Sequence, residues 1–362
     1  MWRSRGGAPA TGSIARRPLA PSLPVFSIAE IGLNHNGDLT RAIALVDAAA
    51  TAGATAVKLQ SLRADRLIAP ACPPPSHVVA SSLREFFAGF ELDLDAHRAV
   101  VARAREHGLV VMSTPFDEEI IPMLEELEID AYKIASGDLT HDGLIAAAAR
   151  TGKPVVISSG MSTLAEVIRA VNVARHAGAE QIAVLHCVSS YPAPVNAENL
   201  RAVETLALAL DVPVGLSDHS SEGLPSAIAA VALGACIYER HLMLAGDAAN
   251  DAIDAAVSST PEGFAAIVAA MERTRRALGD GRKRCQPAEA DNKPLSRRGL
   301  YARRALRAGE RIAASDLIAL RPAASFAPPD LPRLLESTLL HDVPAGAPLR
   351  AEHLVGILER AS

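Results

Sequence analysis

Eight short apolar runs, each followed by a stretch with helical spacing, constrain the fold of this 362-residue chain more than any other feature. The predicted strands cover residues 26–31, 56–60, 109–113, 131–134, 155–158, 182–186, 213–216 and 235–238. Strands that alternate with helices pair in parallel, and eight such units over roughly 250 residues match a (β/α)8 TIM barrel. A doubly wound open sheet is the alternative, but such sheets usually have fewer strands.

Two of the helical stretches carry start and stop signals. Ile43, Val46 and Ala50 repeat at helical spacing before a glycine, which predicts a helix with that face buried. Thr163 and Glu166 form a capping-box pattern at the start of a second helix, in which we expect residues 168, 171 and 174 to share the buried face.

Changes in composition and apolar patterning along the sequence divide the α/β chain into four parts. Residues 1–24 are rich in Arg, Gly, Ala and Pro without the apolar core of a signal peptide, so a disordered tail is favoured over a transit peptide. The barrel is expected over residues 25–280 and a polar linker over 281–296. A small loop-rich domain, with one helical pattern at 330–336, is expected over 297–362.

Composition excludes several classes of protein. The charge is balanced, with 36 basic and 41 acidic residues, which gives no reason to expect nucleic acid as a partner. No apolar run reaches the roughly 18–20 residues of a membrane span. The four cysteines lack a C-x-x-C spacing and are expected to be free thiols of a cytoplasmic protein.

Polar residues follow every predicted strand, although the strand bodies are apolar. Active sites of TIM barrels lie at the C-terminal ends of the strands, so these side chains are expected to share one pocket. In chain order the candidates are Glu30, Lys58, Gln60, Thr114, Lys133, Ser136, Asp138, Ser158, Tyr191, Ser217, His219 and His241.

Lys58 and Lys133 would place two like charges in that pocket, which is costly unless an anion neutralises them. With the nearby hydroxyls they can form a cradle for phosphate and carboxylate groups. Two alternatives remain open: structural pairing of the lysines with Glu30 and Asp138, or a Schiff-base lysine as in aldolases of this fold.

His219 and His241 follow the seventh and eighth predicted strands, each beside a carboxylate, Asp218 or Glu239. Two imidazoles on adjacent strand ends can bind one divalent metal ion, with water and a substrate oxygen completing the shell. The alternative is that both histidines serve as hydrogen-bonding residues.

Five motifs resemble those of the sialic acid synthase family, which includes N-acetylneuraminate, legionaminate and pseudaminate synthases. In order along the chain they are Ala-Glu-Ile-Gly-x-Asn-His-x-Gly at 29–37, Val-Lys-x-Gln at 57–60, Lys-Ile-Ala-Ser-Gly at 133–137, His-Cys-Val-Ser-x-Tyr-Pro at 186–192 and Gly-Leu-Ser-Asp-His at 215–219. The resemblance spans residues 26–356. It implies a TIM barrel followed by a small antifreeze-like (SAF, β-clip) domain that caps the barrel of the partner in a domain-swapped homodimer.

The resemblance also implies roles for individual residues. Glu30 matches the family's catalytic acid/base carboxylate, and the two lysines belong to the catalytic set. The phosphoenolpyruvate contacts match Lys58, Thr114, Lys133, Ser136, Ser158 and Ser217. The sugar contacts match Gln60, Tyr191, Asp254 and, from the other subunit, Arg321, and Asp138 is grouped with them. His219 and His241 match the ligands of a divalent metal ion. Mn²⁺ is the ion expected first, and Mg²⁺ and Co²⁺ are the alternatives.

The implied reaction condenses phosphoenolpyruvate with an N-acylated amino sugar such as N-acetylmannosamine, giving a sialic-acid-like 2-keto acid and phosphate. The metal is expected to polarise the sugar aldehyde, and Glu30 to assist the addition of water. A Schiff-base aldolase and a non-catalytic sugar-binding protein are the competing hypotheses.

The chain departs from the family mostly on the sugar side, so the identity of the acceptor is open. The usual Gly-Pro-Asp-His appears as Ala-Ile-Asp-Ala at 252–255, and the usual Glu-Lys-His as Glu-Arg-His at 239–241. The second domain opens with Arg-Arg-Gly-Leu at 297–300 in place of Arg-Arg-Ser-Leu, and lacks the glycine expected after Arg321-Pro322.

Overall fold

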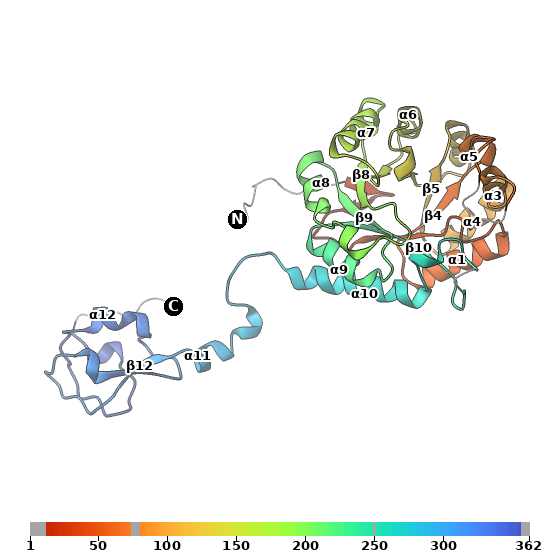
Figure 1. Ribbon diagram of the computed structural model, residues 1–362. Coiled ribbons are helices and arrows are strands. Elements are labelled where there is room, and N and C mark those ends of the chain that lie inside the picture. The colour runs from red at the N-terminus through yellow and green to blue at the C-terminus, as the bar shows by residue number, and fades with distance from the viewer. Residues whose placement is uncertain (1–11, 74–79, 249–250, 356–362) are drawn as a thin grey trace. The chain divides into compact units, whose positions relative to one another are not determined.

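The computed structural model describes residues 12–73, 80–248 and 251–355 (Figure 1). The chain forms two compact units, the first ending at Gly279 and the second beginning at Asp280. We describe each unit by itself.

The first unit is a closed barrel of eight parallel strands, which confirms the predicted TIM barrel. Each strand pairs with the next along the chain, and β10 also pairs with β3, so that no edge is left open. The strands are β3 (Phe26–Glu30), β4 (Ala56–Ser61), β5 (Val110–Pro115), β6 (Ala131–Ile134), β7 (Val155–Ser158), β8 (Ile182–Cys187), β9 (Val214–Asp218) and β10 (Ile237–Leu242). A two-residue strand, β11 (Ser258–Ser259), adds to β10.

A helix follows each barrel strand, and the helices surround the barrel in Figure 1. They are α1 (Leu39–Thr51), α4 (Leu94–Glu106), α5 (Ile121–Glu126), α6 (Asp142–Arg150), α7 (Leu164–His176), α8 (Ala202–Leu210), α9 (Leu224–Ala232) and α10 (Pro261–Leu278). Two shorter helices, α2 (Ala64–Leu67) and α3 (Leu83–Ala88), lie between β4 and α4.

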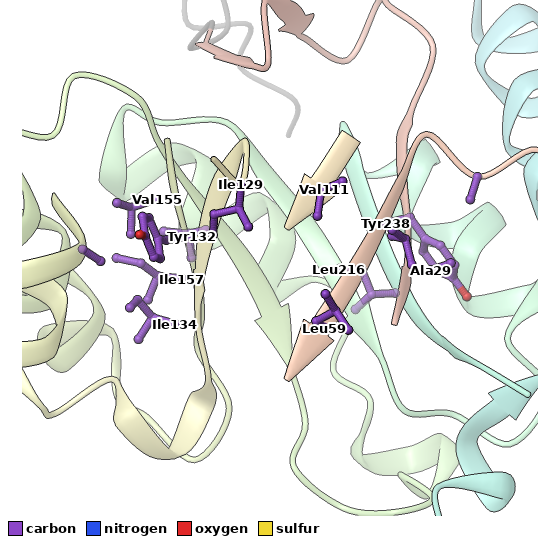
Figure 2. Close-up of a cluster of buried hydrophobic side chains, with 14 of the residues drawn as sticks. Ala29, Leu59, Val111, Ile129, Tyr132, Ile134, Val155, Ile157, Leu216 and Tyr238 are labelled. Atoms are coloured by element: carbon purple, nitrogen blue, oxygen red, sulfur yellow. The ribbon is translucent and has the colours of Figure 1, made fainter. Parts of the chain in front are cut away.

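Side chains alternate between the two faces of the strands, and this alternation positions the site. Outward residues such as Leu59, Ile157 and Tyr238 join the large apolar cluster between strands and helices (Figure 2). Inward residues near the strand starts, such as Ile28 and Ile237, form a second cluster inside the barrel. Because the period of a strand is two residues, the inward positions that follow in each strand carry the polar side chains at its C-terminal end.

Several strands extend further than predicted, because their last residues are polar. The seventh runs to Asp218 instead of 216, and the eighth spans Ile237–Leu242 instead of 235–238. All six residues of β10 are buried, including Glu239, Arg240 and His241. The polar residues at these positions therefore belong to the site and still form part of the strand.

The expected capping box of Thr163 and Glu166 is confirmed at the start of α7. The predicted buried faces are only partly right. In α1, Val46 is buried, whereas Ile43 and Ala50 are half-buried. In α7, Val171 and Ala174 are buried as predicted, whereas Ile168 is exposed and its neighbour Val167 is buried.

The expectation of a disordered tail through residue 24 is wrong for residues 12–24; residues 1–11 lie outside the described part of the chain. Strands β1 (Gly12–Ile14) and β2 (Arg17–Leu19) form an antiparallel hairpin. Ile14 and Leu19 are buried in the inner cluster of the barrel, beside the strand starts. Two apolar residues in a polar segment are enough to order it, since the barrel offers them an apolar surface.

Replacing Ile14 by Ala should lower the free energy of unfolding by about 2–4 kcal/mol, because a fully buried side chain leaves a cavity when it is truncated. Urea denaturation would measure the change. The matched control is Val195→Ala, at a residue 82% exposed, which should change stability by less than about 0.5 kcal/mol. Equal stability of the Ile14→Ala variant and the wild type would show that the hairpin is not part of the folded unit.

The second unit has its own apolar core, which includes Leu300, Leu317 and Phe326. Its elements are α11 (Asn292–Ser296), β12 (Gly299–Ala302), β13 (Leu317–Leu320) and α12 (Leu331–Leu334), with β12 and β13 antiparallel. The helix expected at 330–336 is thus shorter, and residues 292–296 of the predicted linker are helical.

Short 3-10 helices occur in both units, at Glu118–Ile120, Ser136–Asp138, Val195–Ala197, Ala255–Val257, Pro287–Glu289, Ala314–Asp316, Pro328–Asp330 and Ala351–His353. None of the helices in the described ranges combines the length and apolarity that a bilayer crossing requires.

Candidate active site

A cavity of about 270 Å³ opens at the C-terminal ends of the barrel strands. Eleven of the predicted site residues line it: Glu30, Lys58, Gln60, Thr114, Lys133, Ser136, Ser158, Tyr191, Ser217, His219 and His241. Every one of the eight strands or the loop that follows it contributes at least one of them. The prediction that these residues share one pocket is therefore right in its geometry.

Two lysines and two glutamates form a buried charge cluster in this cavity. Lys58 makes an ion pair with Glu30. Glu239 lies between the two lysines, with its Oε1 atom 3.8 Å from Lys58 Nζ and 3.7 Å from Lys133 Nζ. The side chains of all four are no more than 6% exposed, so little solvent screens the charges.

The environment shifts the pKa values within this cluster. Burial alone would raise the pKa of Glu239, but Lys133 and Lys58 outweigh it and hold that pKa at about 2. Burial and, to a lesser degree, the charge of Lys133 lower the pKa of Lys58 from 10.5 to about 8, although Glu239 raises it. Glu239 is therefore a fixed negative charge, while Lys58 holds its proton less tightly than an ordinary lysine.

Hydroxyl groups surround the lysine ammonium groups. Lys58 Nζ donates to Thr114 Oγ1 at 3.2 Å, and Lys133 Nζ donates to Ser158 Oγ at 2.5 Å. Ser217 Oγ donates to Glu239 Oε1 at 3.0 Å. All of these groups line the same cavity, and such a set of donors is suited to an anion that carries several oxygen atoms.

The structure bears on the open question of the two lysines. Lys58 does pair with Glu30, as the structural alternative expected. Lys133 faces Glu239 in place of the expected Asp138. Because each positive charge has a buried negative neighbour, the cluster balances without a ligand, and it still offers ammonium and hydroxyl donors to one.

His219 and His241 lie side by side at the same cavity, with ring centroids 5.6 Å apart. His219 Nδ1 contacts the carbonyl oxygen of Val188 at 2.9 Å, and His241 Nδ1 lies 3.2 Å from Asp254 Oδ2. Both Nδ1 atoms thus face oxygen atoms of the protein, which leaves the Nε2 atoms as the available ligands. Tyr191 stacks on His219 with its ring centroid 4.2 Å away.

The two histidines fit a divalent metal ion that takes its remaining ligands from water and substrate. A carboxylate or carbonyl that contacts Nδ1 is the usual way in which a ligating imidazole is oriented. Burial lowers the pKa of His241, which favours the neutral imidazole that binds metals. Among the described residues no cluster of three or more His, Cys, Asp or Glu side chains could hold a metal.

Three predicted site residues do not line the cavity. Asp138 lies in the 3-10 helix after β6, outside the lining set, and burial raises its pKa to about 6. Asp254 does not line the cavity itself, but its carboxylate lies next to the ring of His241, which does. Arg321 belongs to the second unit, where its residue is exposed.

Two further lining residues are Glu239, which the sequence suggested only as a carboxylate beside His241, and Cys187, which was expected only to be a free thiol. Glu239 lies two residues before His241 on the same strand, so the alternation places both side chains on the inner face. The predicted strand ended at 238, which hid this relation. Asp218 was expected beside His219, but it points to the outer face, where it accepts a hydrogen bond from Tyr238.

Comparison with known proteins finds matches to two protein-family models and to named synthases. Residues 45–283 match the NeuB family, and residues 297–355 match the SAF domain. N,N'-diacetyllegionaminic acid synthase of Campylobacter jejuni is 35% identical over 82% of this chain and 90% of the relative. The enzyme of the same name from Legionella pneumophila is 34% identical over 93% of this chain and 97% of the relative.

A solved structure gives the same result. The N-acetylneuraminic acid (sialic acid) synthetase of Leptospira borgpetersenii, crystallised with citrate, superimposes with a TM-score of 0.71 at 31% identity. The alignment covers 80% of this chain and 96% of that structure.

Proposed function

The chain belongs to the NeuB family, and from this premise we propose that it condenses phosphoenolpyruvate with an N-acylated amino sugar. The products would be a nonulosonic acid and inorganic phosphate. The observation that carries the proposal is the single cavity that Lys58, Lys133 and their hydroxyl partners line together with His219 and His241. The relatives are synthases of legionaminic and sialic acids by name, which agrees with it.

The residues present suggest how the two substrates are held. The ammonium groups of Lys58 and Lys133, with Thr114 and Ser158, would bind the carboxylate and phosphate of phosphoenolpyruvate. Ser136 and Ser217 line the same cavity and could contribute further hydroxyl groups. Tyr191, which is 52% exposed, and Gln60 would contact the sugar nearer the opening.

The reaction balances as follows. C3 of phosphoenolpyruvate forms a carbon–carbon bond with the aldehyde carbon of the open-chain sugar, whose oxygen becomes a hydroxyl. Water adds at C2, and the bond between C2 and the phosphate oxygen breaks, which releases phosphate and leaves the 2-keto acid. Glu30, whose carboxylate contacts Lys58, would take up one proton of the water, and an equivalent proton goes to the former aldehyde oxygen. The second proton of the water leaves with the phosphate as the C2 carbonyl forms.

His219 and His241 would hold Mn²⁺ or a similar divalent ion, and this ion would supply Lewis-acid polarisation of the aldehyde. Asp254 would keep the ring of His241 in place. Four free cysteines suit the reducing conditions of the cytoplasm, where we expect the reaction to take place.

Phosphate release from phosphoenolpyruvate tests the proposal directly. We would incubate the protein with phosphoenolpyruvate, Mn²⁺ and a panel of N-acylated amino sugars, with and without a chelator. Release that needs one of the sugars and stops with chelator would support the proposal and identify the acceptor. Release that is independent of sugar, or a pyruvate adduct trapped on a lysine by borohydride, would contradict it.

Phosphoenolpyruvate binding should weaken as the pH rises through about 8. The protonated form of Lys58 binds the anion, and its lowered pKa means that the charge is lost from about pH 8 upward. The dissociation constant, measured by calorimetry, should change little around pH 7, where the phosphate is largely dianionic, and rise up to tenfold per pH unit above pH 8. In a Lys58→Arg variant the dependence above pH 8 should disappear, since arginine stays charged; persistence of the rise would assign it to another group.

Arg321→Ala should raise the KM for the amino sugar at least tenfold and change the KM for phosphoenolpyruvate by less than about twofold. We propose that the SAF domain of one subunit caps the barrel of the other in a homodimer, where Arg321 would contact the sugar. Steady-state kinetics with each substrate varied in turn would measure both constants. Arg350→Ala, at another exposed arginine of the second unit, is the control. Equal effects on both constants would contradict the capping role.

A further inference from the structure

Behind the two histidines, on the outer face of β9 and β10, lies a buried ion pair that the proposed reaction does not use. Arg240 Nη1 is 3.3 Å from Asp218 Oδ2, and the two side chains are 1% and 3% exposed. Asp218 directly precedes His219, and Arg240 directly precedes His241. The ion pair therefore joins the two strand ends that carry the imidazoles.

Arg240 also joins these strand ends to their surroundings. Its Nε donates to Ser259 Oγ of β11 at 2.6 Å, and its Nη1 donates to the carbonyl oxygen of Ser220 at 3.0 Å. A longer contact of 3.4 Å runs from Nη2 to the carbonyl oxygen of Ser221. Tyr238 donates to Asp218 Oδ2 at 2.6 Å, so the carboxylate is held from a second side.

The loop after β9 is shaped around the guanidinium group. Gly223 has a φ of +74°, and a Cβ atom there would lie 2.7 Å from Arg240 Cζ and 2.8 Å from its Nε. Any larger residue would push against the guanidinium. The loop that begins at His219 is thus packed directly onto Arg240.

We propose that Arg240 is a positioning residue that sets the separation and orientation of His219 and His241. A guanidinium group can donate in several fixed directions at once, and here it reaches β9, β11 and the loop after His219. A lysine, the residue that is usual at this position in the family, has one nitrogen atom and cannot span these partners, so the link is a feature of this chain with its arginine. The proposal rests on the metal site that His219 and His241 form in the proposed function.

The affinity for Mn²⁺, measured by the electron paramagnetic resonance signal of the free ion, tests this proposal without any turnover. Arg240→Lys keeps the positive charge and removes the guanidinium group that donates to several partners. The dissociation constant for Mn²⁺ should therefore rise about 10–100-fold. Binding of phosphoenolpyruvate in the absence of metal should change by less than about twofold. Tyr238→Phe, which removes one hydrogen bond to Asp218, should weaken Mn²⁺ binding about threefold or more and serves if Arg240→Lys does not fold.

Two controls separate the possible failures. Ser113→Ala breaks a buried hydrogen bond to Ser61 Oγ (2.7 Å) in β5, away from the histidines, and should lower the melting temperature without changing Mn²⁺ affinity. His241→Ala should abolish Mn²⁺ binding; binding as tight as in the wild type would overturn the metal site itself. If His241→Ala fails to bind Mn²⁺ while Arg240→Lys and Tyr238→Phe bind it like the wild type, the positioning role of Arg240 is wrong and the proposed function stands.

Discussion

His241→Ala is expected to reduce phosphate release by about a thousandfold, because Lewis-acid polarisation of an aldehyde contributes several kcal/mol to the rate. Among the residues that the structure describes, His219 and His241 are the two imidazoles that line the cavity, so a single one would remain. The side chain lies at the strand end, outside the apolar clusters, and the fold should survive. Activity with saturating phosphoenolpyruvate, sugar and Mn²⁺ measures the loss, and circular dichroism checks the fold.

The matched control for this variant is His176→Ala. His176 is an exposed histidine at the end of α7, where its Nδ1 contacts the carbonyl oxygen of Asn172. This change should leave phosphate release within about twofold of the wild type. Full activity in the His241→Ala variant, with the control unchanged, would show that the reaction does not depend on this histidine as a metal ligand.

Lys133→Met is expected to have two separable effects. The free energy of unfolding should fall by about 3 kcal/mol, because Glu239 would lose one of its two buried positive neighbours. Affinity for phosphoenolpyruvate should fall at least about 100-fold, because Lys133 and its partner Ser158 would no longer bind the anion. Urea denaturation measures the first effect and calorimetry the second.

The double variant Lys133→Met/Glu239→Gln distinguishes these effects. Removing the charge of Glu239 together with that of Lys133 should restore most of the lost stability, as expected for coupled neighbours. It should not restore the binding of phosphoenolpyruvate. A double variant that binds the anion as tightly as the wild type would exclude Lys133 from the anion site.

Much of the fold could be predicted from the sequence, because the apolar strand bodies and the helices between them repeat with a fixed rhythm. All eight barrel strands lie where the apolar runs predicted them. The predicted ends of the strands were wrong where a strand continues through polar residues, as at Glu239 in β10. A buried polar side chain inside a strand looks like a loop residue until its charged partners are known.

The sequence was enough to predict which residues form the site, but not which of them contact one another. The residues at the strand ends could be listed, since the C-terminal ends of parallel strands meet at one mouth. Their pairing could not: Lys133 faces Glu239, and Asp254 faces His241, across separations of more than ten residues along the chain. The hairpin at residues 12–19 was missed because only Ile14 and Leu19 carry its apolar signal.

The depth of the lysines has a consequence for the order of events during turnover. Lys58 and Lys133 are 4% and 3% exposed, whereas Tyr191 is 52% exposed at the rim of the same cavity. A sugar that contacts Tyr191, as proposed above, would cover the exposed part of the cavity and leave the lysines behind it. For the proposed reaction we therefore expect phosphoenolpyruvate to bind before the sugar, so that inhibition by a dead-end sugar analogue is uncompetitive with respect to phosphoenolpyruvate.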